Sequence, residues 1–216
     1  MKETKNNLTE LVFILDRSGS MEGLEKDTIG GFNSMLEKQR KQDGKAYVTT
    51  VLFNQEITTL HDRIELEKVE RMTEKDYEVR GCTALVDAVG MTVSHISNIH
   101  KYARDEDRPE NTLFVIITDG LENSSREYTG AQVKKMISQK EELGWQFIFI
   151  GANIDAIETA AEFGIGKDNA VDYIADKKGT NVVYEAVADA ICCARANNPV
   201  GKKWKRRVEI DYKERR

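Results

Sequence analysis

Cysteine is scarce in this 216-residue sequence, which contains only Cys82, Cys192 and Cys193. Their number is odd and two of them are neighbours, so the pattern does not indicate a disulfide framework. Cys192 and Cys193 lie in an apolar helical pattern, and we expect them in the core. Long apolar runs are also missing, since no stretch approaches the roughly 20 residues needed to span a bilayer. The opening residues 1–7 contain no apolar segment of the kind found in secretory signals. These absences predict a protein of the reducing cytoplasm.

Residues typical of several catalytic centres are missing as well. The histidines His61, His95 and His100 are scattered, and the two on one predicted helix lie five apart, which is poor spacing for a shared metal. No Gly-x-x-x-x-Gly-Lys sequence is present to hold nucleotide phosphates, and no Gly-x-Gly-x-x-Gly follows the first predicted strand. We therefore predict no catalytic residues and no nucleotide cofactor.

Charge is distributed unevenly along the chain. The net charge is −5, but residues 201–216 hold 8 basic and 3 acidic residues and carry +5, which leaves −10 on residues 1–200. A basic tail on an acidic body can mark an anionic partner, and Trp204 is a candidate stacking ring for a nucleic acid. The favoured interpretation is a solvated tail, or a strand docked on the body.

Strand and helix patterns alternate along the sequence. Continuous apolar runs at residues 11–15 and 113–117 predict strands that are covered on both faces. Apolar positions at helical spacing predict helices near residues 29–36, 85–99, 133–143 and 183–194. The β-rich runs 47–53 and 57–66 are joined by a short polar link, which predicts an antiparallel hairpin.

This alternation predicts the fold class. Strands that alternate with helices form a mostly parallel sheet with right-handed crossovers and helices on both faces. The hairpin adds one antiparallel strand, which we place at an edge of the sheet. We therefore expect an α/β, doubly wound, Rossmann-like fold. Residues 1–200 are expected to form one domain, and residues 201–216 a basic C-terminal tail.

Oxygen-bearing side chains follow the predicted strands. Asp16, Ser18 and Ser20 come directly after the first strand, Thr83 precedes the second long helix, and Asp119 follows the strand at 113–117. In doubly wound sheets these loops lie at the same edge, where ligands bind. Two carboxylates and three hydroxyls form a hard-oxygen set that suits Mg²⁺, Mn²⁺ or Ca²⁺ and not zinc. The sequence therefore predicts a divalent-cation site.

This pattern resembles the metal-ion-dependent adhesion site of von Willebrand factor A domains. Here the family's Asp-x-Ser-x-Ser reads Asp16-Arg17-Ser18-Gly19-Ser20, its distant threonine is Thr83, and its Asp-Gly pair is Asp119-Gly120. The resemblance covers roughly residues 10 to 195, because the element order and the edge hairpin also match. Cys82 departs from the family, in which glycine is frequent. Ile29-Gly30-Gly31-Phe32-Asn33 is most similar to stand-alone bacterial or phage intracellular members.

The resemblance implies a role for each ligand. Ser18 and Ser20 would bind the ion directly, Asp16 would act mainly through water, and Thr83 and Asp119 would exchange between the two modes. An acidic side chain of a partner protein would fill the open position on the ion. Asp87 is expected to favour the dipole of its helix and is left out of the ligand set. Cys82 is expected to be a small packed residue.

Two alternatives remain open beside this protein-binding module. One is a Mg²⁺-dependent phosphoryl-transfer enzyme that uses Asp16. Against it, the position two residues after Asp16 is Ser18, where such a phosphatase typically carries a second aspartate. The other is nucleic-acid binding through residues 201–216, against which the acidic body argues. We expect no enzymatic activity.

Overall fold

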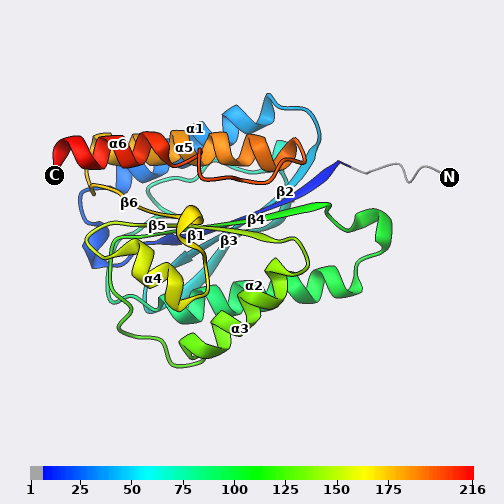
Figure 1. Ribbon diagram of the computed structural model, residues 1–216, viewed down its shortest axis with the longest axis horizontal. Coiled ribbons are helices and arrows are strands. Elements are labelled where there is room, and N and C mark those ends of the chain that lie inside the picture. The colour runs from blue at the N-terminus through cyan, green and yellow to red at the C-terminus, as the bar shows by residue number, and fades with distance from the viewer. Residues whose placement is uncertain (1–6) are drawn as a thin grey trace.

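Residues 7–216 are described by a computed structural model, and they form a six-stranded sheet in the order β3-β2-β1-β4-β5-β6 (Figure 1). Apart from Asn7, the opening segment considered for a secretory signal lies outside the described residues. No helix within residues 7–216 is long and apolar enough to cross a membrane. The strands are β1 (Leu8–Asp16), β2 (Lys45–Phe53), β3 (Ile57–Glu65), β4 (Asn111–Thr118), β5 (Gln146–Gly151) and β6 (Ala170–Asp172).

The pairing of these strands confirms the predicted fold class. All neighbouring pairs are parallel except β2 and β3, which form the antiparallel hairpin at one edge. β1 lies in the middle, next to β2 on one side and β4 on the other, and every residue of β1 is buried. The strand order reverses between β1 and β4, so the loops after these two strands meet at the point where doubly wound sheets bind ligands.

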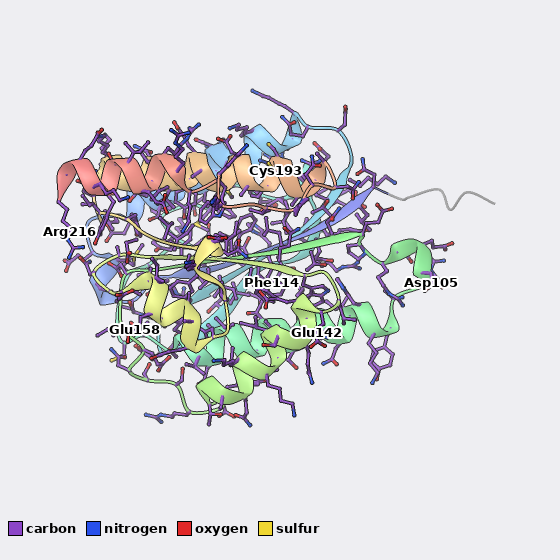
Figure 2. The ribbon with its side chains drawn as sticks, viewed as in Figure 1. Asp105, Phe114, Glu142, Glu158, Cys193 and Arg216 are labelled. Carbon is purple, nitrogen blue, oxygen red and sulfur yellow. The ribbon has the colours of Figure 1, made fainter. Side chains whose placement is uncertain are left out.

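Helices cover both faces of the sheet, as predicted. In Figure 1, one layer lies above the sheet and contains α1 (Glu25–Arg40), α5 (Lys177–Arg195) and α6 (Arg206–Arg215). The layer below it contains α2 (Leu85–Tyr102), α3 (Gly130–Glu141) and α4 (Ala156–Glu162). Alternate side chains of the strands therefore enter two separate cores. Figure 2 shows Phe114 of β4 at the centre of the molecule, and its ring stacks on that of Phe147 at 4.9 Å between centroids.

The end of the chain differs from the expected solvated tail or docked strand, because it forms helix α6 packed on α5 and β6. Trp204 is only 6% exposed, and its Nε1 donates to the carbonyl of Asp168 at 3.3 Å. The buried Nζ of Lys205 donates to the carbonyls of Lys167 and Ala170 at 2.6 and 2.8 Å. The tryptophan therefore anchors the helix and is not available to stack on a base.

One tight contact joins α1 to α5. A methyl group on Gly31 would overlap the ring of Tyr184, with Cγ only 2.7 Å away, whereas a methyl on Gly30 would meet nothing within 4 Å. We expect Gly31→Ala to lower the free energy of unfolding by about 1–3 kcal/mol through overpacking. Gly30→Ala should raise it by about 0.5–1 kcal/mol through helix propensity. Urea unfolding of both variants tests this, and equal effects would contradict the packing argument.

Candidate metal site

Asp16 is held rigidly at the end of β1. The carboxylate is 1% exposed, and its Oδ1 accepts a hydrogen bond from the backbone N–H of Ser18 at 2.7 Å. Its Oδ2 accepts from Oγ1 of Thr118, the last residue of β4, at 2.6 Å. The buried hydroxyl of Tyr77 donates to the carbonyl of Asp16. These contacts fix the turn that carries Ser18 and Ser20.

The structure brings the three predicted hydroxyls together with Asp119. Oγ of Ser18 lies 3.0 Å from Oγ of Ser20, which donates to Oδ1 of Asp119 at 2.5 Å. A Cβ atom placed on Gly120 would lie 2.9 Å from Oγ1 of Thr83, 3.0 Å from Oγ of Ser20 and 3.6 Å from Oγ of Ser18. The hydroxyls therefore converge beside Gly120, which has no side chain to obstruct them.

Thr83 is positioned through its backbone by the loop after Asp119. Its N–H donates to Oδ1 of Asn123 at 2.9 Å, and its carbonyl accepts from the N–H groups of Asn123 and Ser124 at 3.0 and 3.2 Å. On the other side, the N–H of Gly19 donates to the carbonyl of Gly81 at 3.0 Å. The three loops that carry the predicted ligands are therefore bonded to one another.

Two further carboxylates, which the sequence did not assign to the site, hold this loop in place. Asp87 accepts from three successive N–H groups of the loop at 2.7 to 2.9 Å. Glu122 accepts from the N–H of Val86 in the first turn of α2 at 2.8 Å, and from Ser124 and Ser125. Asp87 is therefore more than a residue that favours the helix dipole. A carboxylate in a first helical turn was the only signal, and it does not reveal distant partners.

Removal of the Asp87 carboxylate should loosen the loop. Asp87→Ala leaves three backbone N–H groups without acceptors, and we expect it to lower the free energy of unfolding by about 2–3 kcal/mol. Asp27 also lies in the first turn of a helix, α1, so Asp27→Ala is a matched control that should cost about 0.5 kcal/mol. Urea unfolding of the two variants measures the difference. Similar losses would show that Asp87 acts only on the helix dipole.

Burial raises the pKa values of both aspartates of the site. Burial raises the pKa of Asp119 from 3.8 to about 6, with a smaller contribution from the nearby charge of Asp16, while the Ser20 hydroxyl opposes the shift. Burial also raises the pKa of Asp16, and hydrogen bonds from Thr118 and Ser18 oppose it. Oδ2 of Asp119 is buried and accepts no hydrogen bond from any described residue. A cation beside these oxygens would relieve both the repulsion and the missing contact.

These residues fit a hard divalent cation. The donors around Gly120 are all oxygens, and one carboxylate oxygen is buried without a partner. Within residues 7–216, no group of three or more His, Cys, Asp or Glu side chains could hold an ion. An ion at this site would therefore depend on the hydroxyls of Ser18, Ser20 and Thr83. Cys82, expected to be packed, is exposed beside them, because Gly81 and Cys82 form the outer surface of their loop.

Comparison with known proteins shows the fold. No protein-family model and no curated protein sequence matches the chain. The solved von Willebrand factor domain of the type V pilus tip protein Mfa5 from Porphyromonas gingivalis matches with a TM-score of 0.60 and 10% identity. That match covers 85% of this chain and 94% of the other. A von Willebrand factor type A protein from Catenulispora acidiphila matches with a TM-score of 0.56 and 16% identity, and the match covers 84% of this chain and 42% of the other.

A third structure is described with a metal. It is proximal thread matrix protein 1 from the mussel byssus, with a zinc-occupied metal-ion-dependent adhesion motif, and it matches with a TM-score of 0.58 and 14% identity. The match covers 85% of this chain and 46% of that protein, so this chain spans less than half the length of the byssus protein. Identities of 10 to 16% carry the fold alone. The chain therefore has the fold of von Willebrand factor A domains.

Proposed function

We propose that this chain is a protein-binding module that depends on a divalent cation, with Asp16, Ser18, Ser20, Thr83 and Asp119 as the ligands. Mg²⁺ is the proposed ion, with Mn²⁺ or Ca²⁺ as substitutes. The observation that carries the proposal is the buried Oδ2 of Asp119, which has no hydrogen-bond donor among the described residues. Such an orphaned carboxylate oxygen is costly in isolation, and a bound cation compensates it.

An acidic side chain of a partner protein is the proposed external ligand. Five protein oxygens, some acting through water, leave a position open on a six-coordinate ion. A partner carboxylate is a hard oxygen donor of the kind that such an ion prefers. The mussel byssus protein supports the proposal, because it shares the fold and is described with zinc in its metal-ion-dependent adhesion motif.

The two alternatives have less support. A phosphoryl-transfer enzyme would use Asp16 as nucleophile, but both oxygens of Asp16 accept hydrogen bonds and the residue is 1% exposed. Nucleic-acid binding through residues 201–216 loses its stacking ring, since Trp204 is buried. We therefore propose a module without catalytic activity. We further propose that it acts in the cytoplasm, as a stand-alone domain of the bacterial or phage type.

Affinity capture tests the proposed function. Wild-type protein and the Ser18→Ala/Ser20→Ala variant are each incubated with extract in Mg²⁺ and in EDTA. A protein retained only by the wild type in Mg²⁺ is the expected result, and it would identify the partner. Equal retention in all four arms would contradict an ion-dependent contact. Phosphatase and nucleotide-hydrolysis assays of the same preparation then test the enzymatic alternative.

A further inference from the structure

Part of the surface beside the converging hydroxyls is uncharged. It includes four exposed, uncharged residues that we term the rim patch: Gly19, Gly81, Cys82 and Leu121. Gly19 and Gly81 are hydrogen-bonded neighbours, and Leu121 directly follows the Gly120 around which the hydroxyls gather. Depletion of charge marks the central part of protein interfaces.

Charged side chains next to the rim patch in sequence are tied into the protein. Arg17, between two of the proposed ligands, donates from Nη2 to Oγ1 of Thr58 at 2.8 Å. Arg80, which precedes Gly81, pairs with Glu56 at 3.4 Å. The carboxylate of Glu122, which follows Leu121, is directed inward to the N–H of Val86 at 2.8 Å. Arg17 and Glu122 are therefore tied to neighbouring parts of the protein, while Arg80 and Glu56 form an exposed pair with no net charge beside the rim patch.

Leu121 stands out within the rim patch because it is a large apolar side chain that is 66% exposed. The residues after it are held firmly, since Glu122 bonds to α2 and Asn123 bonds to Thr83 in both directions. A side chain presented by a rigid loop loses little conformational freedom when a partner covers it. Leu121 therefore has the exposure and the support of an apolar interface anchor.

We propose that the rim patch, with Leu121 as its anchor, binds a partner segment in which the acidic residue is flanked by apolar side chains. This inference rests on the proposed function, because the acidic residue is the one that completes the ion. The ion selects the carboxylate through coordination, and the uncharged surface selects its neighbours through burial of apolar area. A partner segment with charged flanks would have to desolvate those charges without any compensation.

Two synthetic peptides test the inference on the full chain in Mg²⁺. Acetyl-Gly-Leu-Glu-Leu-Gly-amide has apolar flanks, and acetyl-Gly-Gly-Glu-Gly-Gly-amide has none. NMR titration should show that the first binds about tenfold more tightly, because one additional leucine contact contributes roughly one factor of ten. Replacement of glutamate by glutamine, or addition of EDTA, should abolish the binding of both peptides.

Matched variants assign the preference to Leu121. Leu121→Ser should reduce the ratio of the affinities for the two peptides to less than about threefold without changing the affinity for Mg²⁺. Leu121→Met should retain the roughly tenfold ratio. Leu143→Ser is the control, since Leu143 is 71% exposed on the loop before β5. Equal binding of the two peptides by the wild type would overturn this inference and leave the proposed function standing. Failure of both peptides to bind in Mg²⁺, or binding unaffected by EDTA, would overturn the proposed function as well.

Discussion

Ser18→Ala/Ser20→Ala is expected to lower the affinity of the protein for Mg²⁺ or Mn²⁺ by about 100-fold or more and to leave the fold intact. Loss of a single group that supports a metal ligand typically costs about 10–100-fold in affinity. Two proposed ligands are lost here at once. Calorimetric titration of the metal-free protein with Mn²⁺ measures the change, and circular dichroism in EDTA reports the fold.

The structure explains why the fold should survive. The hydroxyl of Ser18 lies within 3.0 Å of that of Ser20, and Ser20 is exposed and donates to Asp119. Loss of that donated bond should cost about 1–2 kcal/mol in EDTA, which is less than the stability of a typical domain. Ser34→Ala/Ser138→Ala removes two exposed hydroxyls from α1 and α3 and is the matched control. A double variant that unfolds where the metal-free wild type is folded would contradict this separation of binding from folding.

Asp119→Asn is expected to stabilise the metal-free protein while strongly weakening its response to metal. The pKa of Asp119 in the folded protein is raised from 3.8 to about 6, so the folded state binds a proton more tightly than the unfolded state. Ionisation of Asp119 therefore weakens folding as the pH rises from about 4 to about 6, and the loss persists above that range. At pH 7.5 in EDTA, the neutral amide should raise the free energy of unfolding by about 1–3 kcal/mol.

The pH dependence provides the control for this prediction. Near pH 4 the wild-type carboxyl is protonated in the folded state, so the advantage of the variant should shrink toward zero. Mg²⁺ should raise the melting temperature of the wild type much more than that of the variant, because the variant has lost one of the two carboxylates of the site. Competition by protons should also weaken ion binding to the wild type below about pH 6. A variant less stable than the wild type in EDTA at pH 7.5 would refute the electrostatic argument.

Asp16→Asn should behave differently although both side chains are buried. Each oxygen of Asp16 already accepts a hydrogen bond, from the N–H of Ser18 and from the hydroxyl of Thr118. An amide cannot accept at both positions, so one buried donor would lose its partner. Asp16→Asn should therefore lower the free energy of unfolding in EDTA. Opposite changes in stability for Asp16→Asn and Asp119→Asn would therefore distinguish Asp16, whose two oxygens both accept hydrogen bonds, from Asp119, whose Oδ2 accepts none from the described residues.

The order of elements was predictable because it depends on local patterns. Apolar runs predicted β1 and β4, and helical spacing predicted α1, α2, α3 and α5 near their observed bounds. The short link at residues 54–56 predicted the edge hairpin of β2 and β3. Each of these patterns lies within a short stretch of sequence, so it can be interpreted without knowledge of the rest of the chain.

Two surface assignments were wrong for a shared reason. Cys193 was expected in the core, but it is exposed on the outer side of α5, in the upper layer of Figure 2. The basic segment after residue 200 was expected in solvent or as a strand, yet it forms α6, and Trp204 and Val208 are buried where this segment packs on the body. Sequence spacing shows that a helix has an apolar face. It does not show which neighbour will cover a given side.

The sequence by itself determined the doubly wound fold and the oxygen-rich loops after β1 and β4, because periodicity and turn residues are local properties. Only the tertiary structure decided how those loops meet. Ser20 and Asp119 are 99 residues apart in the sequence, yet Oγ of Ser20 lies 2.5 Å from Oδ1 of Asp119. Asp87 and Glu122 hold the loop that positions Thr83. Such contacts follow from strand order and from the burial of each carboxylate. Both are properties of the whole packed chain, since strand pairing and burial depend on residues far apart in the sequence.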